Sequence, residues 1–217
     1  MVLDKKARKQ YIAKRVAQEL HDGDVVNLGI GLPTMVADYV PEDIQVVLHA
    51  ELGYAGAGPA PKEGEEDPYI IDSGGTPATI QPYGCFFDSP TSFGLIRGGH
   101  VNITVLGALQ VAANGDIANY MIPGKLVPGM GGAMDLVEGA EKVIVAMDHT
   151  NKGNPKIFEE CSLPLTGKGC VDMIVTEMGV MEVTEEGLVL TELAEGVSFD
   201  DIQAATAAKL IKGPGIE

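Results

Sequence analysis

The chain contains no tryptophan, and aromatic residues make up only 5% of its 217 residues. Smaller side chains take their place, since 45% of the sequence is hydrophobic and 28 residues are glycine. This composition is typical of α/β proteins in which neighbouring backbones approach each other closely. The length fits one large domain, so we expect residues 1–217 to form a single domain.

Basic residues are about half as frequent as acidic ones. The 15 Lys and Arg against 31 Asp and Glu give a formal net charge of −16. A surface this negative repels phosphate backbones, which argues against a nucleic-acid partner. If the ligand is itself an anion, its positive counter-charge must come from a local basic patch or from another chain.

Cysteine is also scarce, with Cys85, Cys161 and Cys170 far apart in the chain. Their number and spacing match neither a disulfide framework nor a zinc site, so we expect reduced thiols, a cytoplasmic protein and no metal. No apolar run approaches the roughly 18 residues of a membrane-spanning helix. The charged start, MVLDKKARKQ, indicates a surface helix rather than a signal peptide. We therefore expect no membrane association.

The hydrophobic pattern alternates between strand-like and helix-like segments. The predicted helices are 4–20, 33–40 and 199–211, and the predicted strands are 25–32, 44–50, 100–111, 141–149 and 170–180. Residues 180–193 predict a hairpin, whereas 53–90 predict mostly loop and short strand, with a solvated charged turn at 62–67. The fold class expected from this order is α/β: a largely parallel open sheet, covered by helices on both faces, with a C-terminal hairpin and helix.

Residues 25–51 resemble a dinucleotide-binding fingerprint. Gly29 and Gly31 form a G-x-G turn after a strand, and Glu51 lies 20 residues beyond Gly31, where such proteins place an acid that binds a ribose. However, Thr34 stands in place of the third glycine, and Pro33 removes a helix-start N–H that a pyrophosphate would use. A tight turn without a ligand explains the two glycines equally well.

Glu51 ends an apolar strand and precedes a segment of almost no side-chain bulk, within VVLHAELGYAGAGPAP (46–61). The carboxyl end of a strand is where ligands gather in open α/β sheets. Gly53, Gly56 and Gly58 remove Cβ atoms nearby, which we interpret as room for a bulky ligand beside the carboxylate. His49 points to the same face, and we expect it simply to be packed.

A second glycine-rich segment, IPGKLVPGMGGAMDLVEGA (122–140), enters a predicted short helix. The backbone N–H groups around Gly131 and Gly132 would form a nest for an anion or a developing oxyanion. A connection whose amides simply meet water is the alternative interpretation of the same residues.

Several segments in one order resemble a known family. Glu51 with its glycine tail is followed by SFGLIRGGHVNITVLGALQV, GDIANYMIPGKLVPGMGGAMDLVEGA and CSLPLTGKGCVDMIVTE. Together they are similar to the B subunit of class I (3-oxoacid) coenzyme A transferases, over about residues 5–210. The resemblance implies that Glu51 is a nucleophile that becomes a glutamyl-CoA thioester. A glutamate suits this role because it is ionised at neutral pH without a base.

The resemblance also implies the remaining parts of the site. Gly131 and Gly132 would hold the thioester oxygen, Gly29 and Gly31 would shape the opposite wall, and Gly53 would lie beside the nucleophile. Arg97 and Lys125 are candidates for contacts with phosphate or carboxylate, although surface solubility explains both equally well.

Coenzyme A is expected as a substrate, with no tightly bound cofactor. The expected partner is a separate A subunit, in an α2β2 tetramer, and we expect little activity without it. The acids implied are acetoacetate, butyrate or acetate.

The chain departs from the family pattern at three places: Leu52 in place of Asn, Tyr120 in place of Trp, and IIDSGG in place of IINAGG. We expect these changes to affect acyl specificity more than the reaction. Two alternatives stay open: an NAD- or sugar-phosphate-binding protein with Glu51 as a ribose hook, and a regulatory domain that has lost its chemistry.

Overall fold

A computed structural model describes residues 4–125, 127 and 129–217 of the chain. The helices are α1 (Lys5–Ala17), η1, a 3₁₀ helix (Pro33–Tyr39), α2 (Ser89–Arg97), α3 (Ala133–Gly139) and α4 (Phe199–Ala205). The strands are β1 (Val25–Leu28), β2 (Val47–Ala50), β3 (Tyr54–Ala57), β4 (Ile80–Phe86), β5 (Ile103–Leu106), β6 (Gln110–Ala112), β7 (Ile117–Ala118), β8 (Lys142–Ala146), β9 (Thr150–Asn151), β10 (Asn154–Pro155), β11 (Ile157–Phe158), β12 (Met173–Val175), β13 (Gly179–Thr184), β14 (Gly187–Leu193) and β15 (Leu210–Lys212). Within the described ranges, every helix is too short or too polar to cross a lipid bilayer.

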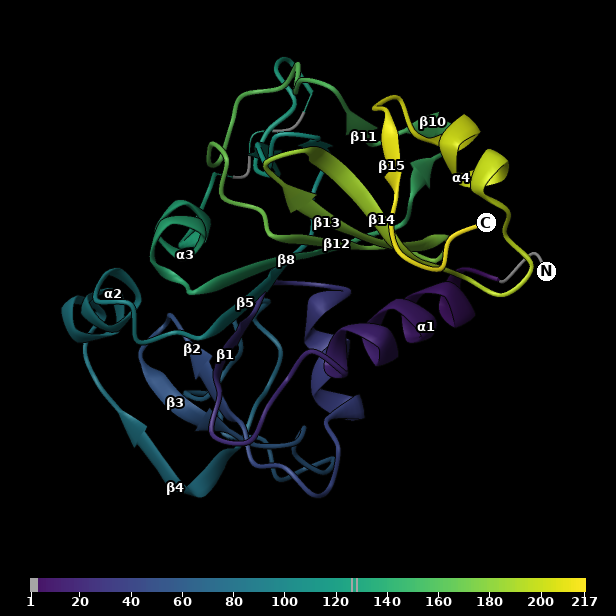
Figure 1. Cartoon of the computed structure of the whole chain (residues 1–217). Coiled ribbons are helices and arrows are strands. Elements are labelled where there is room, and N and C mark those ends of the chain that lie inside the picture. Colours follow the sequence, from purple (N-terminus) through teal and green to yellow (C-terminus); the bar gives the residue numbers. More distant parts are fainter. Residues whose placement is uncertain (1–3, 126, 128) are drawn as a thin grey trace.

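The largest sheet of the described residues has 10 strands in the order β15-β14-β13-β12-β8-β5-β1-β2-β3-β4 (Figure 1). The strands at its centre, from β12 to β2, run parallel to one another. Antiparallel pairs flank this centre on both sides. The predicted fold class, a largely parallel open sheet with a C-terminal hairpin, is therefore confirmed.

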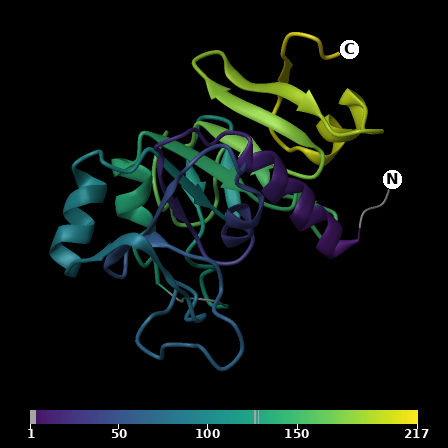
Figure 2. The ribbon, with the colours of Figure 1, turned by 90° about the horizontal axis from the view of Figure 1, so that it is seen from below.

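Helices cover both faces of the central strands, as predicted. Val26 of β1 and Val105 of β5 pack with α1 and η1 on one face. Leu106 of β5 and Val145 of β8 pack with α2 and α3 on the other. Figures 1 and 2 show α1 and the pair α2 and α3 on opposite sides of the sheet. Burial from both sides explains why these strands read as continuous apolar runs in the sequence.

Two predicted elements are shorter than the sequence pattern indicated. The predicted strand 100–111 is divided between β5 and β6, which belong to different sheets. The predicted helix 199–211 ends at Ala205, and the chain then continues into β15. Pairing of Leu210 with Leu188 covers the edge of β14, so a tertiary contact overrides helix propensity here.

The region between β3 and β5 holds more structure than the sequence predicted. The charged turn 62–67 is exposed, as expected, and Figure 2 shows its long connection projecting from the body in blue. Helix α2 was not predicted from the sequence. Its start carries a recognisable signal: the Asp88 side chain accepts a hydrogen bond from the Thr91 N–H, and Pro90 lies in the first turn.

Candidate active site

The order of the parallel strands creates a crevice at one edge of the sheet. From β1 the chain first adds β2 on one side and then adds β5 and β8 on the other. Ligands in open α/β sheets bind where the strand order reverses in this way, outside the carboxyl ends of the strands. A cleft of about 530 Å³ lies at this place. Its lining residues are Asn27, Gly29, Ile30, Glu51, Leu106, Gly107, Ala108, Leu109, Asn119, Tyr120, Gly129, Met130, Gly131, Gly132, Ala133 and Leu136.

Glu51 follows β2 directly and lines this cleft, with its side chain partly exposed. Its Oε2 accepts a hydrogen bond of 3.1 Å from Nδ2 of Asn27 in β1. On the other side lies Gly132, where an added Cβ would be only 3.2 Å from Cγ of Glu51. The structure thus brings together Glu51 and the glycine-rich loop, although they lie about 80 residues apart in the sequence.

Asn27 was missed by the sequence analysis. Its side chain is 1% exposed and also donates to the backbone oxygen of His49 at 3.2 Å. Its Oδ1 is buried and has no partner among the described residues, and the same holds for Oγ1 of Thr104, the in-register neighbour of Asn27 on β5. A polar residue inside the apolar run VVNL was the signal available in the sequence, because buried polar groups in strands need a specific reason.

His49 is buried and packed, as expected, and its ring stacks on Phe87. Burial lowers the pKa of His49, and the nearby Glu51 carboxylate opposes this change only partly. Nδ1 lies 3.3 Å from the Asn27 amide nitrogen, and Nε2 lies 3.1 Å from Oγ of Ser92. The imidazole therefore contacts both Ser92 and Asn27, the residue that binds the Glu51 carboxylate.

Gly29 and Gly31 contribute to the site in different ways. Gly29 lines the cleft, but its N–H donates to the Val105 oxygen at 2.8 Å. A Cβ there would lie 3.0 Å from the Leu106 side chain, so this glycine is needed for close strand packing. Gly31 has a φ of 95° and is exposed, outside the set of residues that line the cleft. The turn leads into a 3₁₀ helix that begins at Pro33.

The glycines after Glu51 have a structural reason that the sequence did not reveal. A Cβ at Gly53 would overlap the carbonyl oxygen of Phe87, and one at Gly56 would lie 2.7 Å from Cα of Gly84. These glycines let β3 pair closely with β4, so our interpretation of them as room for a ligand is corrected. Gly53 itself, with a φ of 130°, is not among the described residues that line the cleft.

The loop before α3 forms the rim of the cleft. Gly131 has a φ of 53°, a left-handed conformation that favours glycine, and Gly132 is the N-cap residue of α3. Met130, next to them, keeps 42% of its surface exposed. Both glycines predicted to bind substrate therefore lie in the same cleft as Glu51.

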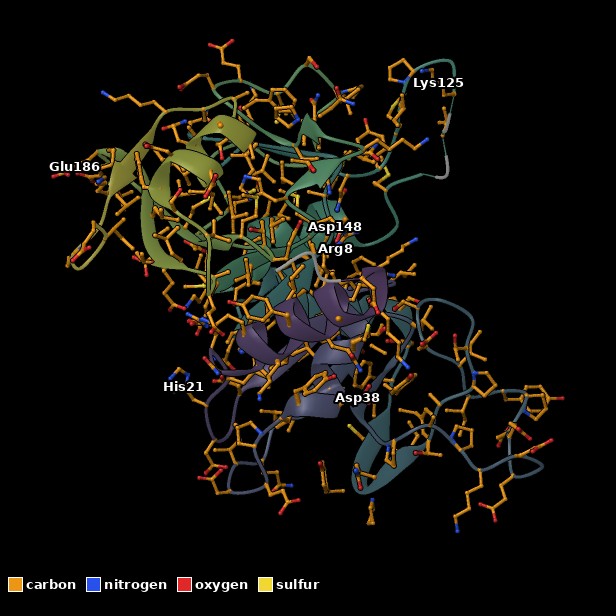
Figure 3. The ribbon with its side chains drawn as sticks, turned by 90° about the vertical axis from the view of Figure 1, so that its right-hand side faces the viewer. Arg8, His21, Asp38, Lys125, Asp148 and Glu186 are labelled. Carbon is orange, nitrogen blue, oxygen red and sulfur yellow. The ribbon has the colours of Figure 1, made fainter. Side chains whose placement is uncertain are left out.

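The two predicted cationic contacts, in contrast, are not brought into the cleft. Arg97 at the end of α2 pairs with Asp135 at 2.6 Å and lies over the ring of Phe93. Lys125 is exposed on the connection between β7 and α3, and Figure 3 shows it at the outer end of that loop.

The wall opposite Glu51 is mostly aliphatic. Leu106, Ala108 and Leu136 belong to the hydrophobic core beneath the cleft. Asn119 also lines it, but its side chain is engaged: Oδ1 accepts from the Thr166 hydroxyl at 2.7 Å, and Nδ2 donates to the Gly107 oxygen. Among the described residues that line the cleft, Glu51 is the one with an acidic side chain, and none has a basic side chain.

Comparisons with known proteins found matches over most of the chain. The family model described as "Coenzyme A transferase" matches residues 9–205. The β subunit of acetate CoA-transferase from Escherichia coli is 50% identical over 202 residues, covering 93% of this chain and 92% of that protein. The B subunit of succinyl-CoA:3-ketoacid coenzyme A transferase from Helicobacter pylori is 50% identical over 202 residues, covering 93% of this chain and 97% of that protein.

A solved structure also matches the fold. A crystal structure of an acyl-CoA transferase from Escherichia coli superposes with a TM-score of 0.75 at 21% identity. The match covers 100% of this chain but only 44% of that protein, so the chain spans less than half of its length. At this identity the likeness concerns the fold alone.

Proposed function

The chain belongs to the coenzyme A transferase family, and we propose that it is the subunit whose Glu51 carries coenzyme A during transfer. The reaction moves CoA from an acyl-CoA to a short-chain carboxylic or 3-oxo acid. The observation that supports Glu51 most directly is its position. Its carboxylate lies in the cleft at the reversal of strand order, accepts a hydrogen bond from Asn27 and lies next to Gly132 of the glycine-rich loop.

In the proposed first half of the reaction, a Glu51 carboxylate oxygen attacks the thioester carbonyl. The C–S bond breaks, CoA leaves as a thiolate, and an acyl-glutamyl anhydride remains. The thiolate then attacks the glutamyl carbonyl of the anhydride, which releases the first acid and forms the glutamyl-CoA thioester. A second acid takes up CoA through the same two steps in reverse, and Glu51 returns to a carboxylate.

Asn27 and the glycine loop have distinct proposed roles in these steps. The Asn27 N–H on Oε2 fixes the carboxylate and leaves Oε1 to attack. The amides of Gly131 and Gly132 would hold the thioester oxygen as it gains negative charge. Binding of the remote parts of CoA would offset the cost of removing water from the carboxylate.

The relatives named as B or β subunits imply a partner A subunit. We propose an α2β2 assembly in which the A subunit supplies most of the positive charge for the CoA phosphates, because this chain has a net charge of −16. Arg97 and Lys125 remain proposed contacts at the surface outside the cleft. Coenzyme A is a substrate in this proposal, with no tightly bound cofactor, and the thiols Cys85, Cys161 and Cys170 are free, in keeping with the proposed cytoplasmic location.

The dinucleotide alternative has less support. Glu51 is already bound by Asn27, the Gly29 N–H is used within the sheet, and the helix after the turn is a short 3₁₀ helix headed by proline. A pyrophosphate site needs free N–H groups at the start of an α-helix.

The test uses the chain co-expressed with its A subunit. Incubation with acetoacetyl-CoA, followed by peptide mass spectrometry, should show a CoA adduct on Glu51. Glu51→Gln should lower kcat by roughly 10⁴-fold or more, while the matched surface variant Glu63→Gln, in the exposed turn, should keep full activity. Activity retained in Glu51→Gln, or NAD binding without any adduct, would refute the proposal.

A further inference from the structure

We propose that His49 is a positioning residue, which holds the Asn27 amide against the Glu51 carboxylate and is itself held by Ser92. The inference rests on the proposed function, because Glu51 is taken as the residue that receives coenzyme A. His49 and Ser92 are outside the set of described residues that line the cleft. They therefore act on the reaction through Asn27 rather than through contact with the substrate.

The Asn27 amide is anchored from one side. Its Nδ2 lies 3.1 Å from Oε2 of Glu51 and 3.2 Å from the backbone oxygen of His49. Because a backbone oxygen can only accept, the NH2 end of the amide must face this side. The other end, Oδ1, is buried without a partner among the described residues. Within those residues, the Asn27 side chain makes its polar contacts with Glu51 and His49 alone, so His49 is what holds this amide in place.

The His49 ring has little room to turn. Its Nδ1 lies 3.3 Å from Nδ2 of Asn27, and its Nε2 lies 3.1 Å from Oγ of Ser92 on α2. The ring also stacks on Phe87, which closely precedes α2, with 5.9 Å between the ring centroids. His49 is 4% exposed and Ser92 is 0% exposed, so both belong to the packed interior. The position of Asn27 is thereby coupled to helix α2.

The proposed arrangement of protons follows from the two neighbours of the ring. The amide nitrogen of Asn27 donates but does not accept, whereas the hydroxyl of Ser92 does either. A proton on Nε2, with Nδ1 free to accept, suits both contacts, and the opposite tautomer would set two N–H groups against each other. Burial lowers the pKa of His49, which favours the neutral ring that this arrangement needs.

Loss of the ring acceptor should slow the chemical step and leave substrate binding nearly unchanged. Without Nδ1, the Asn27 amide keeps the backbone oxygen of His49 but loses the side chain that limits its rotation. The Glu51 carboxylate is then held less precisely, and a misplacement of 1 Å in an active site costs roughly 100-fold. For a smaller displacement we expect about a tenfold fall in kcat, with KM within about twofold.

The experiment compares two replacements of His49 in the complex with the A subunit. His49→Leu removes both ring nitrogens, whereas His49→Gln keeps one acceptor and one donor. The assay measures kcat, KM and the rate at which the CoA adduct forms on Glu51. His49→Leu should lower kcat by about tenfold, and His49→Gln should stay within about threefold of the wild type. His21→Leu is the matched control, because the His21 side chain is 79% exposed, and it should keep full activity.

Two results of this comparison would overturn the inference. A kcat for His49→Leu equal to that of the wild type would show that the ring does not position Asn27. Equal losses in the Leu and Gln variants would show that packing, and not hydrogen bonding, is what matters at this position.

A double variant tests whether His49 acts through Asn27. If it does, Asn27→Ala combined with His49→Leu should have about the same kcat as Asn27→Ala alone, because no amide is left to position. Losses that multiply would overturn the inference. If His49→Leu fails to fold, Ser92→Ala replaces it in the same cycle, with an expected fall in kcat of about threefold on its own.

The wild-type complex separates this inference from the proposed function. Absence of a CoA adduct on Glu51 in the wild type would refute the proposed function. An adduct in the wild type, together with His49 and Ser92 variants that react equally fast, would refute the positioning role alone.

Discussion

Gly132→Ala is the most sensitive test of how Glu51 is held. The added methyl group would lie 3.2 Å from Cγ of Glu51 and 3.5 Å from Cζ of Phe93. Carbon atoms prefer separations of about 3.5–4.0 Å, so one of these neighbours must move by roughly 0.3 Å or more. The Glu51 side chain is partly exposed and is the freer of the two to move toward the cleft.

The expected effect is kinetic rather than structural. Gly132 has φ −84° and ψ 1°, which alanine adopts without strain. As an N-cap residue, alanine is poorer than glycine by roughly 0.5–1 kcal/mol, which lowers Tm by about 2–4 °C. Because a misplacement of 1 Å in an active site costs roughly 100-fold, we expect about a tenfold fall in kcat.

The assay measures kcat and KM for butyrate, together with the rate of formation of the glutamyl-CoA adduct, in the complex with the A subunit. Gly94→Ala is the matched control, because Gly94 is an exposed residue of helix α2 and a Cβ added there would meet no atom within 4 Å. That variant should keep activity within about twofold of the wild type and gain slightly in stability. If Gly132→Ala forms the adduct as fast as the control, the reactivity of Glu51 does not depend on its contact distance to this loop.

Three further outcomes are expected. Asn27→Ala removes the N–H on the Glu51 carboxylate and should lower kcat/KM by about 10- to 100-fold; an unchanged value would show that the carboxylate is positioned without it. Thr104→Val removes a buried hydroxyl without a described partner and should raise Tm by about 2–4 °C, whereas a lower Tm would reveal a hydrogen bond to that hydroxyl. His149 is fully buried, and desolvation lowers its pKa to about 4. As the pH falls, this histidine is therefore protonated in the unfolded chain before it is protonated in the folded chain. The contribution of neutral His149 to the free energy of unfolding is fully present above pH 6.5. It decreases by at most about 3 kcal/mol as the pH falls from 6.5 to about 4. In urea unfolding experiments, the free energy of unfolding of His149→Gln should therefore depend less on pH in that range.

The fold and the proposed nucleophile could be predicted from the sequence because both depend on local patterns. Apolar runs identified the central strands, and Glu51 with its later glycine segments matched a family. The end of α4 at Ala205 was not predictable in this way, because pairing of Leu210 with β14 decides it.

The parts of the site that were missed depend on contacts between distant segments. The clash that requires glycine at position 53 comes from the backbone of Phe87, which no local pattern reveals. In the sequence, Asn27 is simply one polar residue in a predicted buried strand. Its link to Glu51 is visible only in the fold, where the neighbouring strand places the two side chains within hydrogen-bond distance. Likewise, the pairing of Arg97 with Asp135 on another helix could not be seen in the sequence.

The reversal of strand order between β1 and β5 has an evolutionary consequence. The backbone connections that leave these strands diverge, so the hollow between them exists whatever side chains line it. Replacement of a few wall residues can thus alter the accepted molecule without a new scaffold. Enzymes that diverged toward different acids should differ mainly at positions such as Leu109 and Tyr120, while their sheets remain superimposable.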